Sequence, residues 1–520
     1  MLSTRRKHAR NNRWSQPIHR PAAPSRPNNS VTRPRVPAAP MAGLHPLTNQ
    51  TENQRLYNYE QSVKSSFDAI VPVLKRISAI QHEEDFETRA QAIARDQLGF
   101  DLPEEILANA WVDQLDMRKL FAWCVFETYQ RFSDEFFTAD QLINDRDFQA
   151  FLMDCGFHTL DVSPCADGRL AHVISYVLRL PYREVRRKSY AGAMFDIEDS
   201  LAKWTETEFL RFREGRPNTA DEPTRYLKTV VYHFSSGNPD HEGCAAHGSD
   251  TGRAAQAGVD RLRAFQEAVQ NSFCCGASID LLLIGLDTDT DAIRVHVSDE
   301  DGAIDLDSYV DANEVYAETF NMNAQQAASM VEQRARAVSN GATAGMIKLV
   351  CRLIGNNISQ IDYVRQFFNG QYPDIGHAEC FISAGIGFEE IQLRNLTYFA
   401  YMNTVEESTA DLDVGVKIFT GLNVSHGLPI PIVIRFDYHG HVPGARDRAV
   451  ENCKRVADAL RSRYSALAKS GLLHTLLAIR DCAAGERIEV LESSVNAENS
   501  ARNSSRNSSR NSSHKNGGAH

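Results

Sequence analysis

The sequence predicts an α/β protein with an additional all-helical domain near its N-terminal end, on three observations. The chain has 520 residues, 42% of them hydrophobic, and no apolar run of membrane length, which is typical of a soluble protein with two or three compact domains. Apolar residues recur at helical spacing from residue 51 to about 150. From residue 156 onwards, short apolar strands alternate with helical patterns, and this alternation favours a largely parallel sheet.

Basic residues are concentrated in the two tails of the chain. Residues 1–50 hold eight Arg and one Lys but no acidic residue, and residues 502–520 hold three Arg and one Lys, again without acid. All 67 acidic residues therefore lie in the body, which is unsuited to nucleic acid, whereas the tails can bind an acidic surface. The ten Cys are too dispersed for a small secreted disulfide domain, and no signal-peptide pattern is found, so we expect a cytoplasmic setting.

Composition also predicts that both tails are disordered. Residues 1–50 contain eight prolines among Arg, Asn and Ser, so they have too little apolar surface to offset chain entropy. Residues 496–520 end in three copies of Arg-Asn-Ser-Ser, a polar low-complexity sequence. A solvated extension without function is the alternative interpretation of each tail.

Residues 51–148 form the predicted helical domain. Leu56, Val63 and Phe67 lie on one helical face, and Thr138 with Gln141 has the spacing of a capping box at a helix start.

The predicted metal-binding domain spans residues 149–380 and alternates strands with helices. A short strand at 156–162 runs into a turn at Cys165, and an amphipathic helix follows at 170–178. The other predicted elements are helices at 195–213, 254–269, 324–338 and 346–368 and strands at 226–234, 279–285 and 293–297.

The predicted C-terminal domain, residues 381–495, has α/β character as well. It follows a Gly-rich stretch, and its predicted elements are strands at 412–419, 430–438 and 472–479 and a long helix at 445–469. It contains no Cys-x-Asp-x-Arg sequence, so we expect no metal site of that kind in it.

The turn sequence Cys165-Ala166-Asp167-Gly168-Arg169 specifies chemistry more than any other part of the chain. With Cys244 and one imidazole, Cys165 would give the three protein ligands of a catalytic zinc site, which keeps one position open. A ligand in the turn after a parallel strand lies at the carboxyl edge of the sheet, where such sheets usually bind ligands. A planar guanidinium at Arg169 can hold the Asp167 carboxylate ionised and oriented towards a water molecule on the metal.

Spacing does not decide which histidine completes the site. His241 has the compact His-x-x-Cys spacing to Cys244, whereas His233 lies at the end of an apolar strand, and a rigid element positions a ligand better than a loop does. His247 is a third candidate. In the alternative interpretation no metal is bound, Cys165 is a buried thiol, and Asp167 and Arg169 form a surface ion pair. Small buried hydrophobes are the expected role of Cys124, Cys351, Cys453 and Cys482, and also of the pair Cys274-Cys275.

At these residues the chain resembles carbonic anhydrases of the β class, except that ten residues separate His233 from Cys244 where two are usual. A closer resemblance, over about residues 51–490, is to the carboxysome shell carbonic anhydrase family, a diverged β-type branch also called the ε class. The segments that carry it are 155–158 (Cys-Gly-Phe-His), 163–170 (Ser-Pro-Cys-Ala-Asp-Gly-Arg-Leu), 194–199 (Met-Phe-Asp-Ile-Glu-Asp), 217–221 (Pro-Asn-Thr-Ala-Asp), 232–235 (Tyr-His-Phe-Ser), 243–248 (Gly-Cys-Ala-Ala-His-Gly), 274–280 (Cys-Cys-Gly-Ala-Ser-Ile-Asp) and 287–294 (Asp-Thr-Asp-Thr-Asp-Ala-Ile-Arg).

The resemblance implies a zinc site of Cys165, His233 and Cys244, a dyad of Asp167 and Arg169, and a C-terminal domain that is a degenerate duplicate without metal. It places His377 near the metal, either in proton transfer or in holding the domain junction.

The implied activity is zinc-hydroxide catalysed interconversion of CO2 and bicarbonate. It would supply Rubisco on the inner side of the carboxysome shell, in a homodimer or larger homo-oligomer. The basic N-terminal tail would tether the chain to shell proteins or Rubisco. A zinc hydrolase acting on a small substrate and a structural zinc protein of the shell are the alternatives; neither a nucleic-acid nor a membrane partner is expected.

Overall fold

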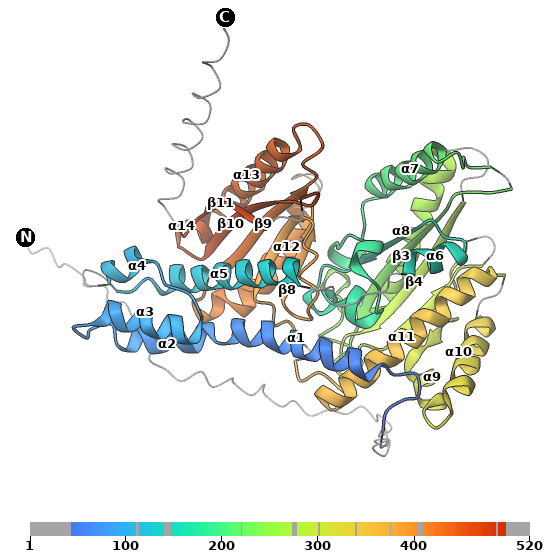
Figure 1. Ribbon diagram of the computed structural model, residues 1–520, viewed down its shortest axis with the longest axis horizontal. Coiled ribbons are helices and arrows are strands. Elements are labelled where there is room, and N and C mark those ends of the chain that lie inside the picture. The colour runs from blue at the N-terminus through green and yellow to red at the C-terminus, as the bar shows by residue number, and fades with distance from the viewer. Residues whose placement is uncertain are drawn as a thin grey trace, which may run out of the picture. The chain divides into compact units, whose positions relative to one another are not determined.

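The computed structural model describes residues 43–495 apart from 111–113, 140–146, 220, 273–277, 300–301, 339–340, 375, 403–408 and 485–486. Over these residues the chain forms a group of N-terminal helices and two α/β units, each built on one sheet (Figure 1). The predicted α/β class with a helical N-terminal region is confirmed. Among the described residues, no helix combines the length and hydrophobicity of a membrane-spanning segment.

The N-terminal helices form because apolar residues recur every three or four positions and pack on one face. They are α1 (Gln50–Asp68), α2 (Ile70–Ala79), α3 (Phe86–Gln97), α4 (Glu104–Asn109) and α5 (Met117–Thr138), whereas the short helix α6 (Phe148–Asp154) lies beside the first α/β unit (Figure 1). Leu56, Val63 and Phe67 of α1 are buried as their spacing predicts. The predicted helix start at Thr138 is wrong, because Thr138 is the last residue of α5, and Gln141 lies outside the described residues.

Packing begins upstream of residue 51. His45 is buried, and its backbone N–H donates to Asp362 Oδ2 at 2.8 Å. The side chain of Asn49 caps α1 by accepting a hydrogen bond from the backbone N–H of Glu52. Residues 45–50 therefore belong to the packed part of the chain, although composition assigns them to the tail.

The first sheet has the strand order β2-β1-β3-β4-β5-β6, in which the first four strands are mutually parallel and β5 pairs antiparallel with both β4 and β6. Its strands are β1 (Thr159–Pro164), β2 (Arg186–Arg187), β3 (Arg225–Phe234), β4 (Ser278–Asp287), β5 (Ile293–Val297) and β6 (Val310–Asp311). The helices of this unit are α7 (Ile197–Arg213), α8 (Thr251–Ser272), α9 (Ala312–Thr319), α10 (Ala324–Val338) and α11 (Ala344–Phe368). Helix α8 packs against β3 and β4.

The amphipathic helix predicted at 170–178 is wrong. A 3-10 turn at Gly168–Leu170 and a single π-helical turn at Val173–Val177 take its place. Every residue from 170 to 178 is buried, so this segment has no solvent face to match an amphipathic pattern. Single π-helical turns are frequently found at functional sites in proteins.

The second sheet has the order β11-β10-β9-β7-β8, parallel except for β11. Its elements are β7 (Phe381–Ile386), β8 (Thr397–Tyr401), α12 (Thr409–Leu422), β9 (Ile430–Tyr438), α13 (Ala445–Arg463), α14 (Ser465–Lys469), β10 (Leu473–Asp481) and β11 (Glu489–Ser493). The strand predicted at 412–419 is wrong, because that segment is helix α12. Strands β8 and β9 run parallel on either side of β7, so the chain between them must cross over, and α12 supplies that crossover.

Apart from the additional strand β6 of the first sheet, the two sheets share one strand order. Each has a first strand flanked by the strand that follows it in the chain, then two further parallel strands and one antiparallel strand. The residue after β1 is Cys165, whereas the residue after β7 is Gly387, where a Cβ atom would lie only 2.2 Å from the Asp437 carboxylate. Arg435 fills this region of the second sheet and pairs with Asp437 at 2.8 Å and with Glu390 at 2.6 Å.

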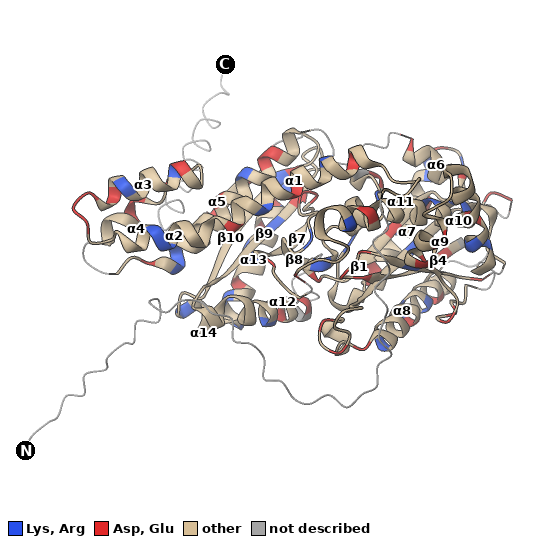
Figure 2. Ribbon diagram, turned by 90° about the horizontal axis from the view of Figure 1, so that it is seen from below, with Lys and Arg blue, Asp and Glu red and all other residues tan. Residues whose placement is uncertain are grey.

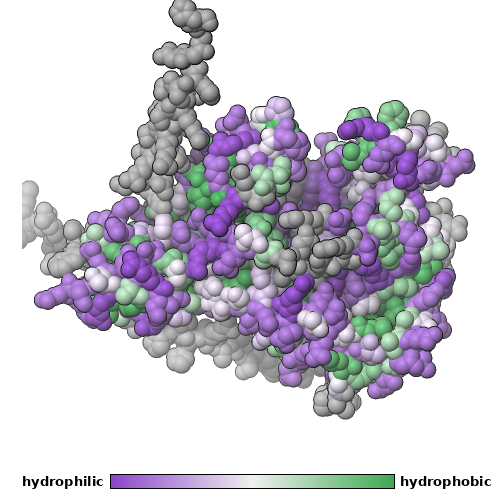
Figure 3. All heavy atoms as spheres, in the orientation of Figure 1, coloured by the Kyte–Doolittle hydropathy of each residue, from purple (hydrophilic) through white to green (hydrophobic). Residues whose placement is uncertain are grey.

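Charged side chains lie mainly on helices and loops, and the strands of both sheets are mostly uncharged (Figure 2). The face seen in Figure 3 is largely hydrophilic, with hydrophobic residues in small separate patches. Cys124 and Cys453 are buried as predicted, Cys351 and Cys482 are partly exposed, and Cys274-Cys275 lies outside the described residues.

Candidate metal centre

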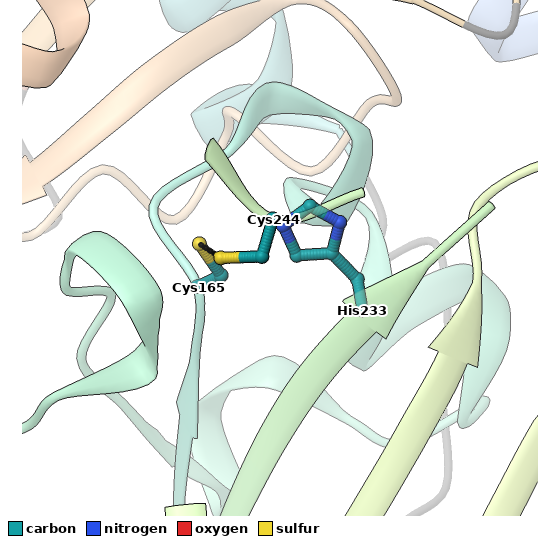
Figure 4. Close-up of side chains that lie close together, drawn as sticks. All are labelled: Cys165, His233 and Cys244. Atoms are coloured by element: carbon teal, nitrogen blue, oxygen red, sulfur yellow. Dashed lines mark hydrogen bonds between the residues drawn. The ribbon is translucent and has the colours of Figure 1, made fainter. Parts of the chain in front are cut away.

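Three predicted ligands come together at the carboxyl edge of the first sheet (Figure 4). Cys165 directly follows β1, and His233 is the penultimate residue of the neighbouring parallel strand β3. Cys244 lies in the loop after β3, at the start of a 3-10 turn at Ala245–His247. All three side chains are buried.

Their geometry fits a metal ion. The two sulfur atoms lie 4.0 Å apart, close to the separation of about 3.8 Å expected for two thiolates on one tetrahedral zinc, and both thiols are free. One ligand atom from each of the three residues lies within 4.8 Å of the others. Neither ring nitrogen of buried His233 makes a hydrogen bond within the described part of the chain, so a metal would satisfy a group that the protein leaves open.

Asp167 and Arg169 form a buried bidentate pair beside these ligands. Arg169 Nε donates to Asp167 Oδ1 at 3.0 Å, and Nη2 donates to Oδ2 at 2.7 Å. Burial alone would raise the pKa of Asp167, but Arg169, His377 and His233 outweigh it and hold that pKa well below its usual range. The carboxylate is therefore ionised, and its Oδ2 lies 3.5 Å from His233 Nε2.

Arg169 also binds the loop that carries Cys244. Its Nη1 donates to the backbone carbonyl of Glu242 at 2.6 Å, and its Nη2 approaches the carbonyl of Gly243 at 3.5 Å. One guanidinium thus links the turn after β1 to the residues just before Cys244.

The second sheet holds the same turn from the opposite side. The backbone N–H of Phe399 in β8 donates to Ala166 O at 3.2 Å, and that of Asn395 donates to Gly168 O at 2.8 Å. Ala166 belongs to the hydrophobic core of the second sheet. The metal centre therefore lies at the junction of the two α/β units, although its ligands all come from the first.

His377 faces the carboxylate of the dyad. Its Nε2 lies 3.8 Å from Asp167 Oδ2, and its Nδ1 lies 2.9 Å from Oε1 of buried Glu379. Burial lowers the pKa of His377, but Asp167 and Glu379 outweigh that effect and raise it to about 9. The same Glu379 oxygen accepts a hydrogen bond from the backbone N–H of Gly168 at 3.1 Å, which ties the histidine to the ligand turn.

The other two histidine candidates do not join the three ligands. His241 is exposed in a turn, and His247 contacts the carbonyl of Gly192 at 3.2 Å. Sequence reasoning missed Glu379 and Asn395, although Glu379 lies only two residues beyond His377 and carries a second acidic group towards it. The fold and these residues together define an α/β protein with a candidate metal centre of two Cys and one His at the carboxyl edge of a parallel sheet.

Comparison with known proteins agrees with this class. This chain matches the carboxysome shell carbonic anhydrase family in all three of that family's domains. Residues 45–137 match the N-terminal domain, residues 147–377 the catalytic domain and residues 378–495 the C-terminal domain. The carboxysome shell carbonic anhydrase of Prochlorococcus marinus (strain MIT 9313) is 55% identical over 503 residues, which cover 94% of this chain and 98% of that relative. That of Halothiobacillus neapolitanus is 45% identical over 466 residues, covering 86% and 90%. The chain belongs to the carboxysome shell carbonic anhydrase family.

Replacing Glu379 by Gln should lower the pKa of His377 from about 9 towards its ordinary value of 6.5, because a neighbouring negative charge is lost. A raised histidine pKa stabilises the fold fully below pH 6.5, and this contribution is lost as the pH rises through about 9. Titration of the His377 ring resonance by NMR measures the shift, and His377→Asn identifies the resonance. An unchanged pKa in Glu379→Gln would contradict the assigned contact.

Proposed function

We propose that this chain catalyses the reversible interconversion of CO2 and bicarbonate at the centre formed by Cys165, His233 and Cys244. The observation that carries the proposal is the meeting of these ligands beside an aspartate held ionised by Arg169. Family membership supports it, since the relatives are named carbonic anhydrases. By the same membership, the chain is a carboxysomal enzyme.

Zinc is the metal that the donor set fits best, because two thiolates and one imidazole with an open position are typical of its catalytic sites. When bound, zinc would act as a Lewis acid that lowers the pKa of water towards about 7 and so provides a nucleophile near neutral pH. Cys165, His233 and Cys244 would hold the metal.

The remaining residues orient the reactants and supply the proton. Asp167 accepts a hydrogen bond from the attacking water and so directs a lone pair towards CO2, while Arg169 prevents the carboxylate from rotating or taking up the proton. Conversion of bicarbonate to CO2 consumes one proton. His377, with a pKa of about 9, holds a proton at neutral pH and is partly exposed, so we assign it proton donation in that direction.

Within the carboxysome, the CO2 produced would supply Rubisco. We also propose that the chain works as a homodimer or larger homo-oligomer, and that its basic N-terminal tail binds an acidic surface of the shell or its cargo.

The reaction is tested by stopped-flow CO2 hydration on protein of measured metal content. The parent should bind one zinc per chain and hydrate CO2, and Cys165→Ser should lose most of both, because a hydroxyl is a weaker zinc ligand than a thiolate. Fully active protein devoid of metal would contradict the proposal. Ester hydrolysis without CO2 hydration would favour a zinc hydrolase instead.

The role of the dyad is tested by Asp167→Asn and Arg169→Ala. Each should lower turnover by about 10²-fold or more, since each removes the oriented acceptor for water. Metal content is measured alongside, because Arg169 also holds the loop that precedes Cys244. Near-normal turnover in both variants would show that the dyad does not orient the nucleophile.

The tail is tested by deleting residues 1–42, which spares the packed residues from His45 onwards. The truncated chain should keep its turnover but no longer be encapsulated. Binding of the intact chain to the acidic surface of the shell or its cargo should weaken as the salt concentration rises. Deletion of residues 502–520 serves as the control, because it removes the other basic tail and leaves the N-terminal tail in place. Complete packaging of the chain without residues 1–42 would exclude the tethering role.

A further inference from the structure

The acidic turn Asp287-Thr288-Asp289-Thr290-Asp291, which follows β4, lies against the loop that follows His233. Strands β3 and β4 are parallel neighbours, so both connections leave the same edge of the sheet. Thr288 begins the contact, because its backbone N–H donates to the carbonyl of Phe234 at 2.9 Å. Asp287 Oδ1 accepts from the backbone N–H of Ser236 at 3.1 Å.

Asp289 makes the central contacts of this turn and is fully buried. Ser235 Oγ lies 3.0 Å from its Oδ1 and 2.8 Å from its Oδ2, and the backbone N–H of Gly237 donates to Oδ2. A Cβ atom on Gly237 would lie 2.8 Å from the same oxygen, so the glycine allows the close approach. Ser235 Oγ in turn accepts from the backbone N–H of Asn238 at 2.9 Å.

These contacts fix the loop that connects two of the proposed metal ligands, His233 and Cys244. Ten residues separate His233 from Cys244, and a connection of this length does not by itself bring the thiolate to the imidazole. Asp289 holds the first part of the loop, over residues 235–238. Arg169 holds its last part through the carbonyl of Glu242. The loop is thus fixed at both ends by buried charged groups.

We propose that Asp289 is a positioning residue for the metal ligands: through Ser235 and the backbone of Gly237 it fixes the path from His233 to Cys244. It touches neither ligand and acts only through the loop. Outer partners that hydrogen-bond a metal ligand directly raise metal affinity by about 10- to 100-fold, and a residue that acts through the loop should have an effect near the lower end of that range. The inference rests on the proposed metal centre, and it explains how a longer His-to-Cys spacing than in other β-class enzymes forms the same kind of site.

The test measures how fast the zinc-loaded full-length chain releases metal to an excess of chelator. Ser235→Ala removes the hydroxyl bound by Asp289, and Asp289→Asn removes the charge while keeping the shape. Each should release zinc at least about tenfold faster than the parent. Ser298→Ala is the matched control, because Ser298 is also buried in this unit and donates one hydrogen bond, to Leu281 O at 3.0 Å.

Thermal unfolding of all variants is followed alongside. Faster release from Ser235→Ala than from Ser298→Ala, at equal unfolding midpoints, supports the positioning role even where Asp289→Asn does not fold. Release from Ser235→Ala within about twofold of Ser298→Ala overturns it. So does a parent chain that holds no metal. Metal release is read without turnover, so loss of CO2 hydration alone would contradict only the proposed reaction.

Discussion

The buried guanidinium of Arg169 is the group on which the geometry of the proposed metal centre depends. A charge without access to water is stable only when every donor finds a partner, and here the partners are Asp167 and the backbone carbonyls of Glu242 and Gly243. The turn that carries Cys165 and the loop that carries Cys244 are therefore not independent. Each supplies part of the environment that makes the other stable, and the two thiols are brought within 4.0 Å as a result.

Apart from β6, the two sheets have the same strand order, but they have different roles. The first carries the candidate ligands, and the second supports their turn through Phe399 of β8 and through Asn395, which lies just before β8. In the second sheet, the place after the first strand is occupied by Gly387 and a buried ion pair between Arg435 and Asp437. Arg435 also donates to Tyr129 of α5 at 2.7 Å, so this buried charge links the second sheet to the N-terminal helices.

The sequence was sufficient where function depends on local pattern. Strand β3 and the Cys165 turn were evident from apolar runs and motif spacing, yet only the adjacency of β1 and β3 separates His233 from His241 by geometry. Contacts of Glu379 and Asn395 with Gly168 span more than 200 residues and leave no local signal. Residues 412–419 alternate as a strand would, but Leu412, Val416 and Phe419 also share one helical face, and the crossover between parallel strands requires the helix. Residues 170–178 are buried on all sides, so periodicity could not define them.

The support of the ligand turn by β8 has a consequence for synthesis of the chain. A nascent polypeptide that has left the ribosome as far as β5 already contains Cys165, His233 and Cys244. It still lacks β8 and Asn395 just before it, which bind the Ala166 and Gly168 carbonyls. Because contacts so distant in sequence form late, the metal centre matures only after nearly the whole protein has emerged. A fragment ending before β7 would contain every sulfur and imidazole of the centre but would lack the hydrogen bonds that hold the turn carrying Cys165.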